Sequence, residues 1–212
     1  MILSIPGVYL SNNYLFWDND SASEIKDAAL IDAAAEPSVV LELLRRNGLR
    51  LKFIILTHGH YDHVANLPAL IGFFPEAKAL CASAEIETLR DPDANVSELF
   101  LDHGVSYPPL SEVFYDGDVV KVGEGDGGRL TVISTPGHTP GSCCLYNEHD
   151  KVMFTGDCLF ADGGIGRVDF PGGSMRLMAA SLNKLSRYPG DVTIYPGHGG
   201  TSTIGAELGG VL

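Results

Sequence analysis

The stretch Thr57-His58-Gly59-His60-Tyr61-Asp62-His63 directly follows an apolar run, Phe53-Ile54-Ile55-Leu56. A short apolar run of this kind predicts a buried strand, and the histidines begin where that strand ends. Because alternate residues of an extended chain share a face, His58 and His60 leave the strand pointing the same way. The stretch therefore predicts a loop in which polar side chains gather at a strand end.

Asp62 and His63 are neighbours in the chain, so on a straight strand they would point apart. The chain must bend in this stretch, and Gly59 allows a bend at low conformational cost. Imidazole nitrogens and carboxylate oxygens are the ligands that borderline divalent metals such as zinc accept. Solvated histidines in a polar loop are the alternative, but three histidines and an aspartate at one strand end favour a metal site.

Three more potential ligands follow apolar strands further along the chain. His138 follows residues 130–133 and a turn, while Asp157 follows residues 152–154 and His198 follows residues 192–195. Loops at the ends of strands in one sheet present their side chains along one rim, so these residues can converge. Asp157 is the one carboxylate of the three, and its two oxygens allow it to bridge two metal ions.

The complete set contains seven potential ligands: His58, His60, Asp62, His63, His138, Asp157 and His198. A single tetrahedral metal needs four at most. Seven ligands suit two divalent ions about 3.5–4 Å apart that share a carboxylate and a hydroxide. Zinc is the first expectation, with iron or manganese as alternatives, because affinity order and cellular supply decide which metal is loaded.

The His-x-His-x-Asp-His motif at residues 58–63, followed in order by His138, Asp157 and His198, resembles the metallo-β-lactamase superfamily. Residues 156–160, 166–173 and 195–199 are similar to its small glyoxalase II-like branch. The resemblance implies an α/β fold, namely an αββα sandwich of two mixed sheets with helices on the outer faces. It also implies that His58, His60 and His138 hold one metal, that Asp62, His63 and His198 hold the other, and that Asp157 bridges.

The resemblance implies a hydrolase of acyl thioesters, similar to hydroxyacylglutathione hydrolases, with Asp62 and Asp157 as catalytic residues. Two cations lower the pKa of a bridging water to ~7, which supplies a nucleophile without a Ser-His or Cys-His pair. The sequence offers no dedicated general acid, so a leaving group that departs as a stable anion is favoured. Thiolates, whose parent pKa is ~8.5, meet this condition better than amines.

Other functions remain open on the same residues. One is an oxidoreductase similar to the persulfide dioxygenases, which use one iron on a His-His-Asp subset of these positions. Another is a different hydrolase of the same fold, such as a lactonase or a β-lactamase. A non-enzymatic binding protein is the third, and the presence of all seven ligands disfavours it.

Five further residues are candidates for the surroundings of the site. Asp32 is expected either to orient a ligand imidazole or to act as a turn residue after its strand. Arg167 and Asp169 are expected to form a wall that contacts an acidic substrate, or an internal ion pair that shapes their loop. Tyr146 and Phe170 are pocket-lining candidates, with burial in the core as the alternative.

The composition limits the class of partner. The 212 residues carry a net charge of −13 and no basic run, which disfavours nucleic acid and anionic membranes and leaves a small-molecule substrate. One domain over residues 1–212 is expected, without the C-terminal helical domain that holds glutathione in full glyoxalase II enzymes. The cysteines (Cys81, Cys143, Cys144 and Cys158) show no metal spacing, so they are expected to be reduced in a cytoplasmic protein.

Apolar patterning and turn residues predict an alternation of strands and helices. Strands are expected near 2–10, 14–17, 28–32, 52–57, 113–115, 118–122, 129–135, 142–147, 150–155 and 192–195. Helices are expected near 37–47, 64–74, 84–101 (interrupted at Asp91-Pro92) and 174–187, with a short helix at the C-terminus. Ser174 is the expected N-cap of the helix over 174–187.

Overall fold

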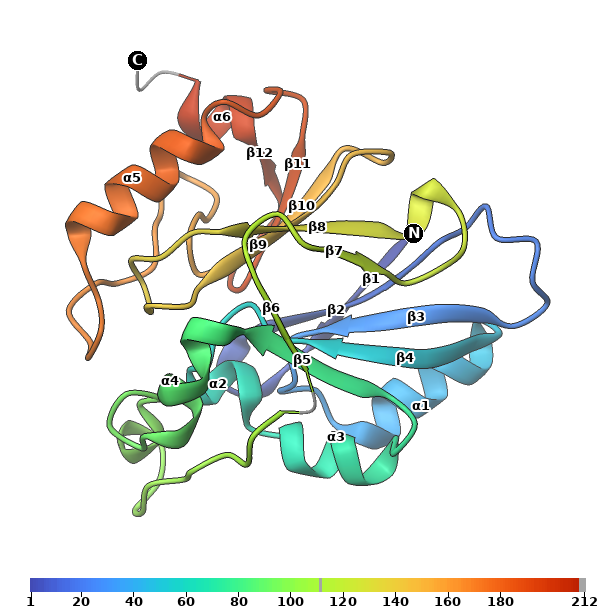
Figure 1. The fold of residues 1–212 in the computed structure, drawn as a ribbon, viewed down its shortest axis with the longest axis horizontal. Helices are drawn as coiled ribbons and strands as arrows, with labels where there is room; N and C mark the ends of the chain where they lie inside the picture. The colour runs from blue at the N-terminus through green and yellow to red at the C-terminus, as the bar shows by residue number, and fades with distance from the viewer. Residues whose placement is uncertain (111, 210–212) are drawn as a thin grey trace.

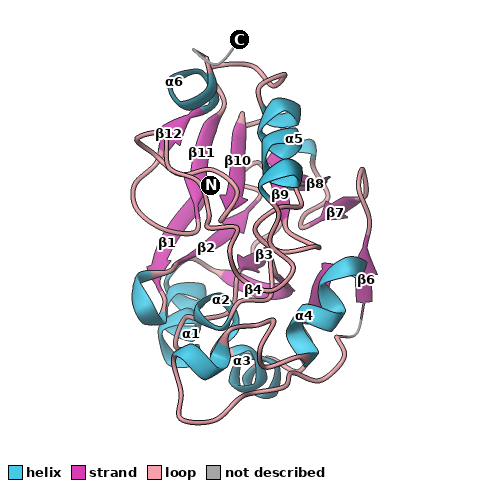
Figure 2. Ribbon diagram, turned by 90° about the vertical axis from the view of Figure 1, so that its left-hand side faces the viewer, coloured by secondary structure: helices cyan, strands magenta, loops and turns pink. Residues whose placement is uncertain are grey.

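Two six-stranded sheets pack face to face, and helices cover the outer face of each (Figure 1). The computed structural model describes residues 1–110 and 112–209. The αββα sandwich that the resemblance implied is confirmed. Seen from the side in Figure 2, the helices of the two outer layers lie at opposite ends of the molecule, with the strands between them.

The first sheet has the order β1-β2-β3-β4-β5-β6. Its strands are β1 (Ile2–Pro6), β2 (Asn12–Trp17), β3 (Lys26–Ile31), β4 (Leu49–Ile55), β5 (Lys78–Ala82) and β6 (Glu112–Phe114). The strands β1, β2 and β3 pair antiparallel, whereas β3 to β6 pair in parallel. The parallel half therefore presents the carboxyl ends of β3, β4 and β5 along one edge.

The second sheet has the order β12-β11-β10-β9-β8-β7. Its strands are β7 (Val119–Lys121), β8 (Arg129–Ser134), β9 (Cys143–Asn147), β10 (Val152–Gly156), β11 (Thr193–Pro196) and β12 (Ser202–Thr203). Only the β10–β11 pair is parallel; the other pairs are antiparallel.

Helices cover both sheets, and two of them begin with a side-chain cap. They are α1 (Pro37–Arg46), α2 (Tyr61–Val64), α3 (Leu67–Phe73) and α4 (Ile86–Arg90) on the first sheet, and α5 (Met175–Leu185) and α6 (Ile204–Leu208) on the second. The predicted N-cap is confirmed, because the Ser174 hydroxyl accepts a bond from the Leu177 amide at the start of α5. In the part of the chain that the structure describes, no helix has both the length and the apolar character needed to cross a membrane.

Alternation along the central strands fills three apolar layers. On β3, Ala28 and Leu30 pack under the helices of the first sheet, while Ala29 and Ile31 face the second sheet. Phe154 of β10 packs in the apolar layer between the two sheets, whereas Met153 packs on the other face of its sheet, under α5 and α6. Both sheets are thus buried on two faces, which leaves loops at the strand ends to carry polar chemistry.

Several expected elements differ in the structure. The first strand ends at Pro6 rather than residue 10, because a 3₁₀ turn at Val8–Leu10 with positive φ at Tyr9 and Leu10 turns the chain back into β2. The expected interruption at Asp91-Pro92 is confirmed, because α4 ends at Arg90, but the rest of the helix expected over 84–101 is reduced to 3₁₀ turns at Ser83–Glu85 and Ser97–Leu99. The helix expected over 64–74 is divided into α2 and α3, and strands β5 and β12 were not expected.

Candidate metal centre

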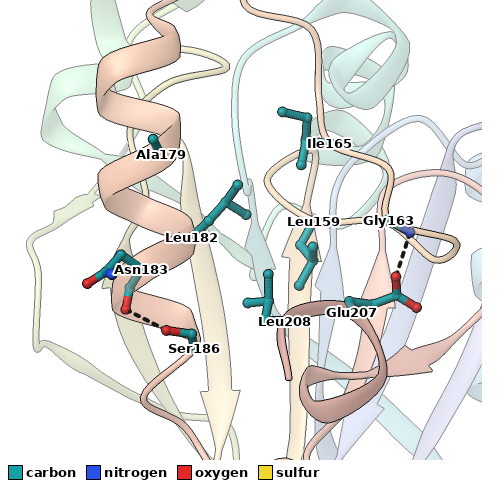
Figure 3. A pocket seen from close by; sticks show the side chains of 9 residues that line it. All are labelled: Leu159, Gly163, Ile165, Ala179, Leu182, Asn183, Ser186, Glu207 and Leu208. Atoms are coloured by element: carbon teal, nitrogen blue, oxygen red, sulfur yellow. Dashed lines mark hydrogen bonds between the residues drawn. The ribbon is translucent and has the colours of Figure 1, made fainter. Parts of the chain in front are cut away.

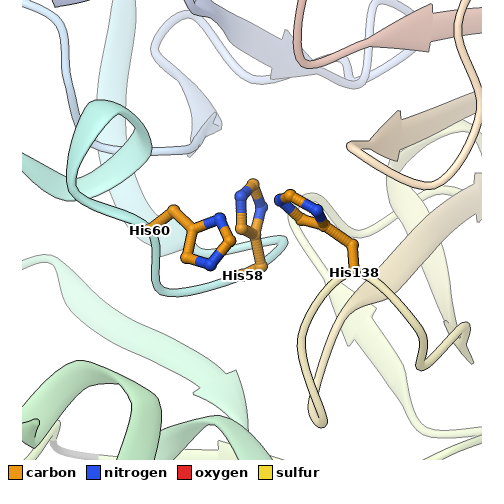
Figure 4. A group of neighbouring side chains, drawn as sticks. All are labelled: His58, His60 and His138. Carbon is orange, nitrogen blue, oxygen red and sulfur yellow. The ribbon is translucent and has the colours of Figure 1, made fainter. Parts of the chain in front are cut away.

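Three histidines from the two sheets point their rings toward one another in Figure 4. His58 and His60 follow β4 of the first sheet, and His138 follows β8 of the second. One potential ligand atom from each lies within 4.8 Å of the others. Among the described residues, the Nε2 atoms of all three are buried and have no hydrogen-bond partner. Unpaired buried nitrogens are costly, so a cation at this point is the arrangement that satisfies them.

A second group lies beside the first. Asp62 and His63 come from the start of α2, and His198 follows β11. The Nε2 atom of His198 lies 3.1 Å from Asp62 Oδ2 and 3.2 Å from the Nε2 atom of His63. Two imidazole nitrogens facing each other at this distance, beside a carboxylate oxygen, fit a shared cation.

Asp157, directly after β10, lies between the two groups. Its Oδ1 is 3.3 Å from His63 Nε2, and its Oδ2 is 3.5 Å from His138 Nε2 and 3.7 Å from His198 Nε2. In the described part of the chain, Asp157 Oδ1 is buried and accepts no hydrogen bond. The structure therefore brings all seven predicted ligands together, with one carboxylate between two clusters.

Hydrogen bonds to the opposite ring nitrogen fix three of the imidazoles. The Nδ1 atom of His63 lies 2.9 Å from Asp32 Oδ2, that of His138 is 2.7 Å from the Arg167 carbonyl oxygen, and that of His198 is 3.2 Å from the Leu10 carbonyl oxygen. Each acceptor requires a proton on Nδ1, which leaves Nε2 with a free lone pair. The positive-φ turn at Leu10 thus has a role in the site that the sequence did not indicate.

Asp32 is the hub of the buried polar network behind the ligands. Its Oδ1 accepts bonds from the Thr57 amide at 2.8 Å and the Thr57 hydroxyl at 3.0 Å, and that hydroxyl lies 3.1 Å from His58 Nδ1. Asp32 adopts a left-handed φ of 63°, a conformation that aspartate tolerates better than most residues. One carboxylate therefore supports His63 directly and His58 through Thr57.

The local electrostatics favour free ligand atoms at His58, His60 and Asp157. Burial would lower the pKa of His63, but the carboxylates of Asp157 and Asp32 outweigh burial and hold that pKa well above its usual value. Burial lowers the pKa of His58 well below its usual value and lowers that of His60 to about 3, so both rings stay neutral. Burial alone would raise the pKa of Asp157, but the adjacent His63 outweighs it and holds the pKa well below the usual range. Neutral imidazoles and an ionised carboxylate are the protonation states that metal ligation requires.

Glu85 is a functional residue that the sequence did not reveal. Its side chain is buried and accepts bonds from the Gly59 amide at 2.8 Å, the Gly141 amide at 2.7 Å and the Thr139 hydroxyl at 2.9 Å. Burial raises its pKa to about 7, against the effect of these hydrogen bonds. One carboxylate thus ties the loop of His58 and His60 to the loop of His138.

The two glycines beside Glu85 are needed for its close approach. A Cβ on Gly141 would lie 2.5 Å from Glu85 Oε2, and a Cβ on Gly59 would lie 3.2 Å from Glu85 Oε1. Gly59 is not among the residues with positive φ, so it serves this contact rather than the left-handed bend that glycine usually permits.

A hollow of about 410 Å³ opens over the two ligand groups. Apart from metal-ligand candidates, its lining residues are Val96, Phe100, Phe160, Ile165, Gly166, Arg167 and Phe170. Arg167 and Asp169 form a two-bond ion pair at 2.7–2.8 Å, and the Arg167 guanidinium lies 3.9 Å from the centre of the Phe170 ring. The structure thus places Phe170 in the wall and Arg167 at its exposed rim, held by Asp169.

Tyr146 does not line this hollow, which corrects the expectation that it could. It lies on the outer face of β9, where its ring packs against Tyr188 at 5.0 Å between centroids and joins the apolar cluster under α5. Because side chains alternate along a strand, the neighbouring Leu145 takes the inner face instead.

Comparison with known proteins agrees with this geometry. The family model of the metallo-beta-lactamase superfamily matches residues 6–198. The chain is 33% identical to the hydroxyacylglutathione hydrolase GloC of Haemophilus influenzae, over 94% of this chain and 90% of that one. It is 37% identical to a hydroxyacylglutathione hydrolase of Cereibacter sphaeroides, over 89% of this chain but 63% of that one.

Solved structures share the fold of this chain. The B3 metallo-β-lactamase BLEG-1 superposes with a TM-score of 0.86 at 29% identity, covering 99% of this chain and 97% of that one. The protein TTHA1623, crystallised in a di-iron-bound form, superposes with a TM-score of 0.80 at 27% identity, covering 98% and 96%. ETHE1 from Myxococcus xanthus superposes with a TM-score of 0.70 at 26% identity, covering 96% and 80%.

Proposed function

Because the chain belongs to the metallo-β-lactamase superfamily, we propose that it is a hydrolase of small acyl thioesters that works with two divalent cations, zinc before iron or manganese. The observation that carries this proposal is the position of Asp157, whose carboxylate lies between two groups of three ligands. His58, His60 and His138 would hold one ion, and Asp62, His63 and His198 the other. When bound, such a pair of ions polarises a carbonyl oxygen and makes hydroxide available near neutral pH.

The chain's own residues orient these ligands. Asp32 and the Arg167 carbonyl hold the Nδ1 protons of His63 and His138, so neither ring can turn its lone pair away from the centre. Asp62 and Asp157 are the two carboxylates among the seven candidate ligands, which supports the proposal that they are the catalytic residues.

A thioester is favoured over an amide because the hollow offers no free proton donor to a departing amine. Beyond the ligand candidates, Arg167 is the one titratable side chain among the lining residues that the structure describes, and Asp169 holds it in an ion pair. A thiolate leaves without a proton far more readily than an amine does. The relatives named hydroxyacylglutathione hydrolases support the same substrate class.

We further propose one domain over residues 1–212 and a small-molecule substrate as the partner. The four cysteines are free and buried, which suits a reducing compartment such as the cytoplasm. The net charge of −13 supports the absence of a nucleic-acid or anionic-membrane partner.

A second candidate function is an iron-dependent oxygenase. His58, His63 and Asp157 form a third cluster with ligand atoms within 4.8 Å, and two histidines with one carboxylate are the set that non-haem iron oxygenases use. The likeness to a protein crystallised in a di-iron-bound form is a further reason to test the chain with iron.

A paired assay on one preparation separates the two candidates. Metal-free protein is loaded separately with zinc, iron and manganese. For each metal, one measurement follows the loss of S-lactoylglutathione, and a second follows oxygen uptake with glutathione persulfide as the substrate. The hydrolase proposal expects thioester turnover above that of the Asp157→Ala variant. Oxygen uptake by the iron form, with no thioester turnover for any metal, would reject it in favour of the oxygenase.

A further inference from the structure

A second hollow lies outside the metal centre, between α5, α6 and the loop that follows β10 (Figure 3). It has a volume of about 360 Å³, within the range of about 300–1,000 Å³ that is usual for small-molecule sites. Its walls are formed mainly by Leu159, Ile165, Leu182 and Leu208, and Figure 3 shows these side chains projecting into the space between the two helices.

Ile165 borders both hollows. It lines the space over the metal-ligand candidates, and it also stands at one end of the space between α5 and α6. On the metal side, Phe160 and Phe170 continue the apolar wall, and Phe170 packs edge-on against His60 at 5.7 Å between ring centres. The two hollows therefore adjoin at Ile165, and apolar side chains line each of them next to it.

Apart from the metal ions proposed above, the described lining residues of the two hollows offer no free cationic side chain to a charged substrate group. In the described residues that line the two spaces, the one cationic side chain besides histidine is Arg167, which Asp169 already neutralises. Glu207 lines the second hollow, but its carboxylate is engaged by the Gly163 amide and the Ser202 hydroxyl. With a net charge of −13, the chain disfavours anionic groups here.

From this arrangement we infer that the second hollow is a subsite for an uncharged apolar chain of the substrate, which passes Ile165 while the thioester faces the metal centre. The inference rests on the proposed thioester hydrolase function and narrows it to thioesters with medium-length aliphatic chains. The chain can be attached on the acyl side or on the sulfur side of the thioester.

The subsite has a measurable consequence for selectivity. Burial of a methylene favours binding by about fourfold, from roughly 0.8 kcal/mol per methylene. An octanoyl thioester that buries three methylenes more than its acetyl counterpart should therefore have a kcat/KM roughly 60-fold higher. Comparing octanoyl N-acetylcysteamine with S-octyl thioacetate, each against acetyl N-acetylcysteamine, identifies the side that carries the chain.

Two neighbouring alanines of α5 give a matched pair of variants. Both alanines are exposed, but Ala179 lines the second hollow and Ala180 is not among its lining residues. Ala179→Phe should fill the space and lower the octanoyl-to-acetyl ratio of kcat/KM by at least tenfold, while Ala180→Phe should keep the wild-type ratio. A flat ratio in the wild type, or an equal effect of both variants, would overturn the subsite even if short thioesters are hydrolysed.

Binding of a thioether that has no bond to hydrolyse separates this inference from the proposed function. Calorimetry with S-octyl-N-acetylcysteamine should show binding to the wild type and to Ala180→Phe, and at least tenfold weaker binding to Ala179→Phe, even if no thioester is turned over. If Ala179→Phe instead changes the sedimentation coefficient and leaves thioether binding unaltered, the hollow is a contact for a second copy of the chain, and the subsite is wrong.

Discussion

Asp157 and Asp32 are both carboxylates beside histidines of the candidate centre, but they face opposite sides of the rings. Asp157 approaches His63 and His138 at Nε2, the side that points into the centre. Asp32 approaches His63 at Nδ1, the side that points into the protein. Asp157 can therefore contact a cation itself, whereas Asp32 acts through the imidazole that it orients.

This difference predicts unequal losses for the two alanine variants. Asp32→Ala should lower metal affinity and kcat/KM by about 10–100-fold, the usual cost of removing a residue that orients a ligand. Asp157→Ala should cost more than about 100-fold, because it removes the one group placed between both ion positions. Both quantities are measured on metal-titrated protein. Activity within a few-fold of wild type for Asp157→Ala, beside an inactive Asp32→Ala, would reverse the assigned roles.

The convergence of the seven candidate ligands was predictable from the sequence because histidines and aspartates recur directly after apolar strands, a pattern that is uncommon outside metal sites. Glu85 was not predictable for the opposite reason. A lone glutamate in a segment with helical character is usually exposed, and only the folded chain brings it to the Gly59 and Gly141 amides. Phe100 and Ile165 were missed similarly, since an apolar residue in a loop gives no sign of whether it lines a pocket.

At the level of elements, the Ser83–Glu85 turn connects the loops after β4 and β8 through the Glu85 side chain. This connection predicts a pH dependence of stability. Burial raises the pKa of Glu85 in the folded protein to about 7, against an ordinary value of 4.5. Between these values the native state holds more protons than the unfolded state, so its contribution to the unfolding free energy falls as pH rises.

Glu85→Gln removes this titration. In metal-free protein, the unfolding free energy of the wild type relative to the variant should fall by about 3 kcal/mol from about pH 4.5 to about pH 7. Urea unfolding followed by circular dichroism at several pH values measures the difference. Parallel stability curves for the two proteins would show that Glu85 does not titrate in this way.

The elements that the sequence missed have short or ambiguous patterns. Strand β5 has small residues at Ala79, Cys81 and Ala82, so its apolar run is weak, yet it pairs with β4 and is buried. The helix expected over 84–101 ends at Arg90, and the Asn95 side chain instead bonds the carbonyl oxygens of Leu89 and Val105. Tertiary hydrogen bonds of this kind override a local helical preference.

At the scale of the whole molecule, the charge of −13 predicts a salt effect that depends on the substrate. A succinyl thioester is anionic, so the protein should repel it at low salt. Between about 0.01 and 0.15 M ionic strength the Debye length falls from about 30 to 8 Å, which screens the repulsion. The kcat/KM of this substrate should therefore rise roughly two- to fivefold over that range. The uncharged acetyl thioester should change little. Equal salt effects on both thioesters would mean that the net charge does not act on the substrate.

The sandwich follows from the resemblance rather than from the patterning of the strands alone. Alternating elements predict a layered α/β protein, but the division into two sheets depends on contacts between distant segments, such as Phe16 of β2 against Phe154 of β10. The same long-range packing places the loops after β4, β8, β10 and β11 at one rim, where the candidate metal centre forms.

Metal content measured by elemental analysis, on protein purified without chelators, tests the central claim most directly. Two transition-metal ions per chain, chiefly zinc, are expected for the wild type. His60→Ala should hold about one ion with an unchanged circular dichroism spectrum, because the group of Asp62, His63 and His198 remains complete. Less than one transition-metal ion per chain in the wild type would contradict the two-metal centre.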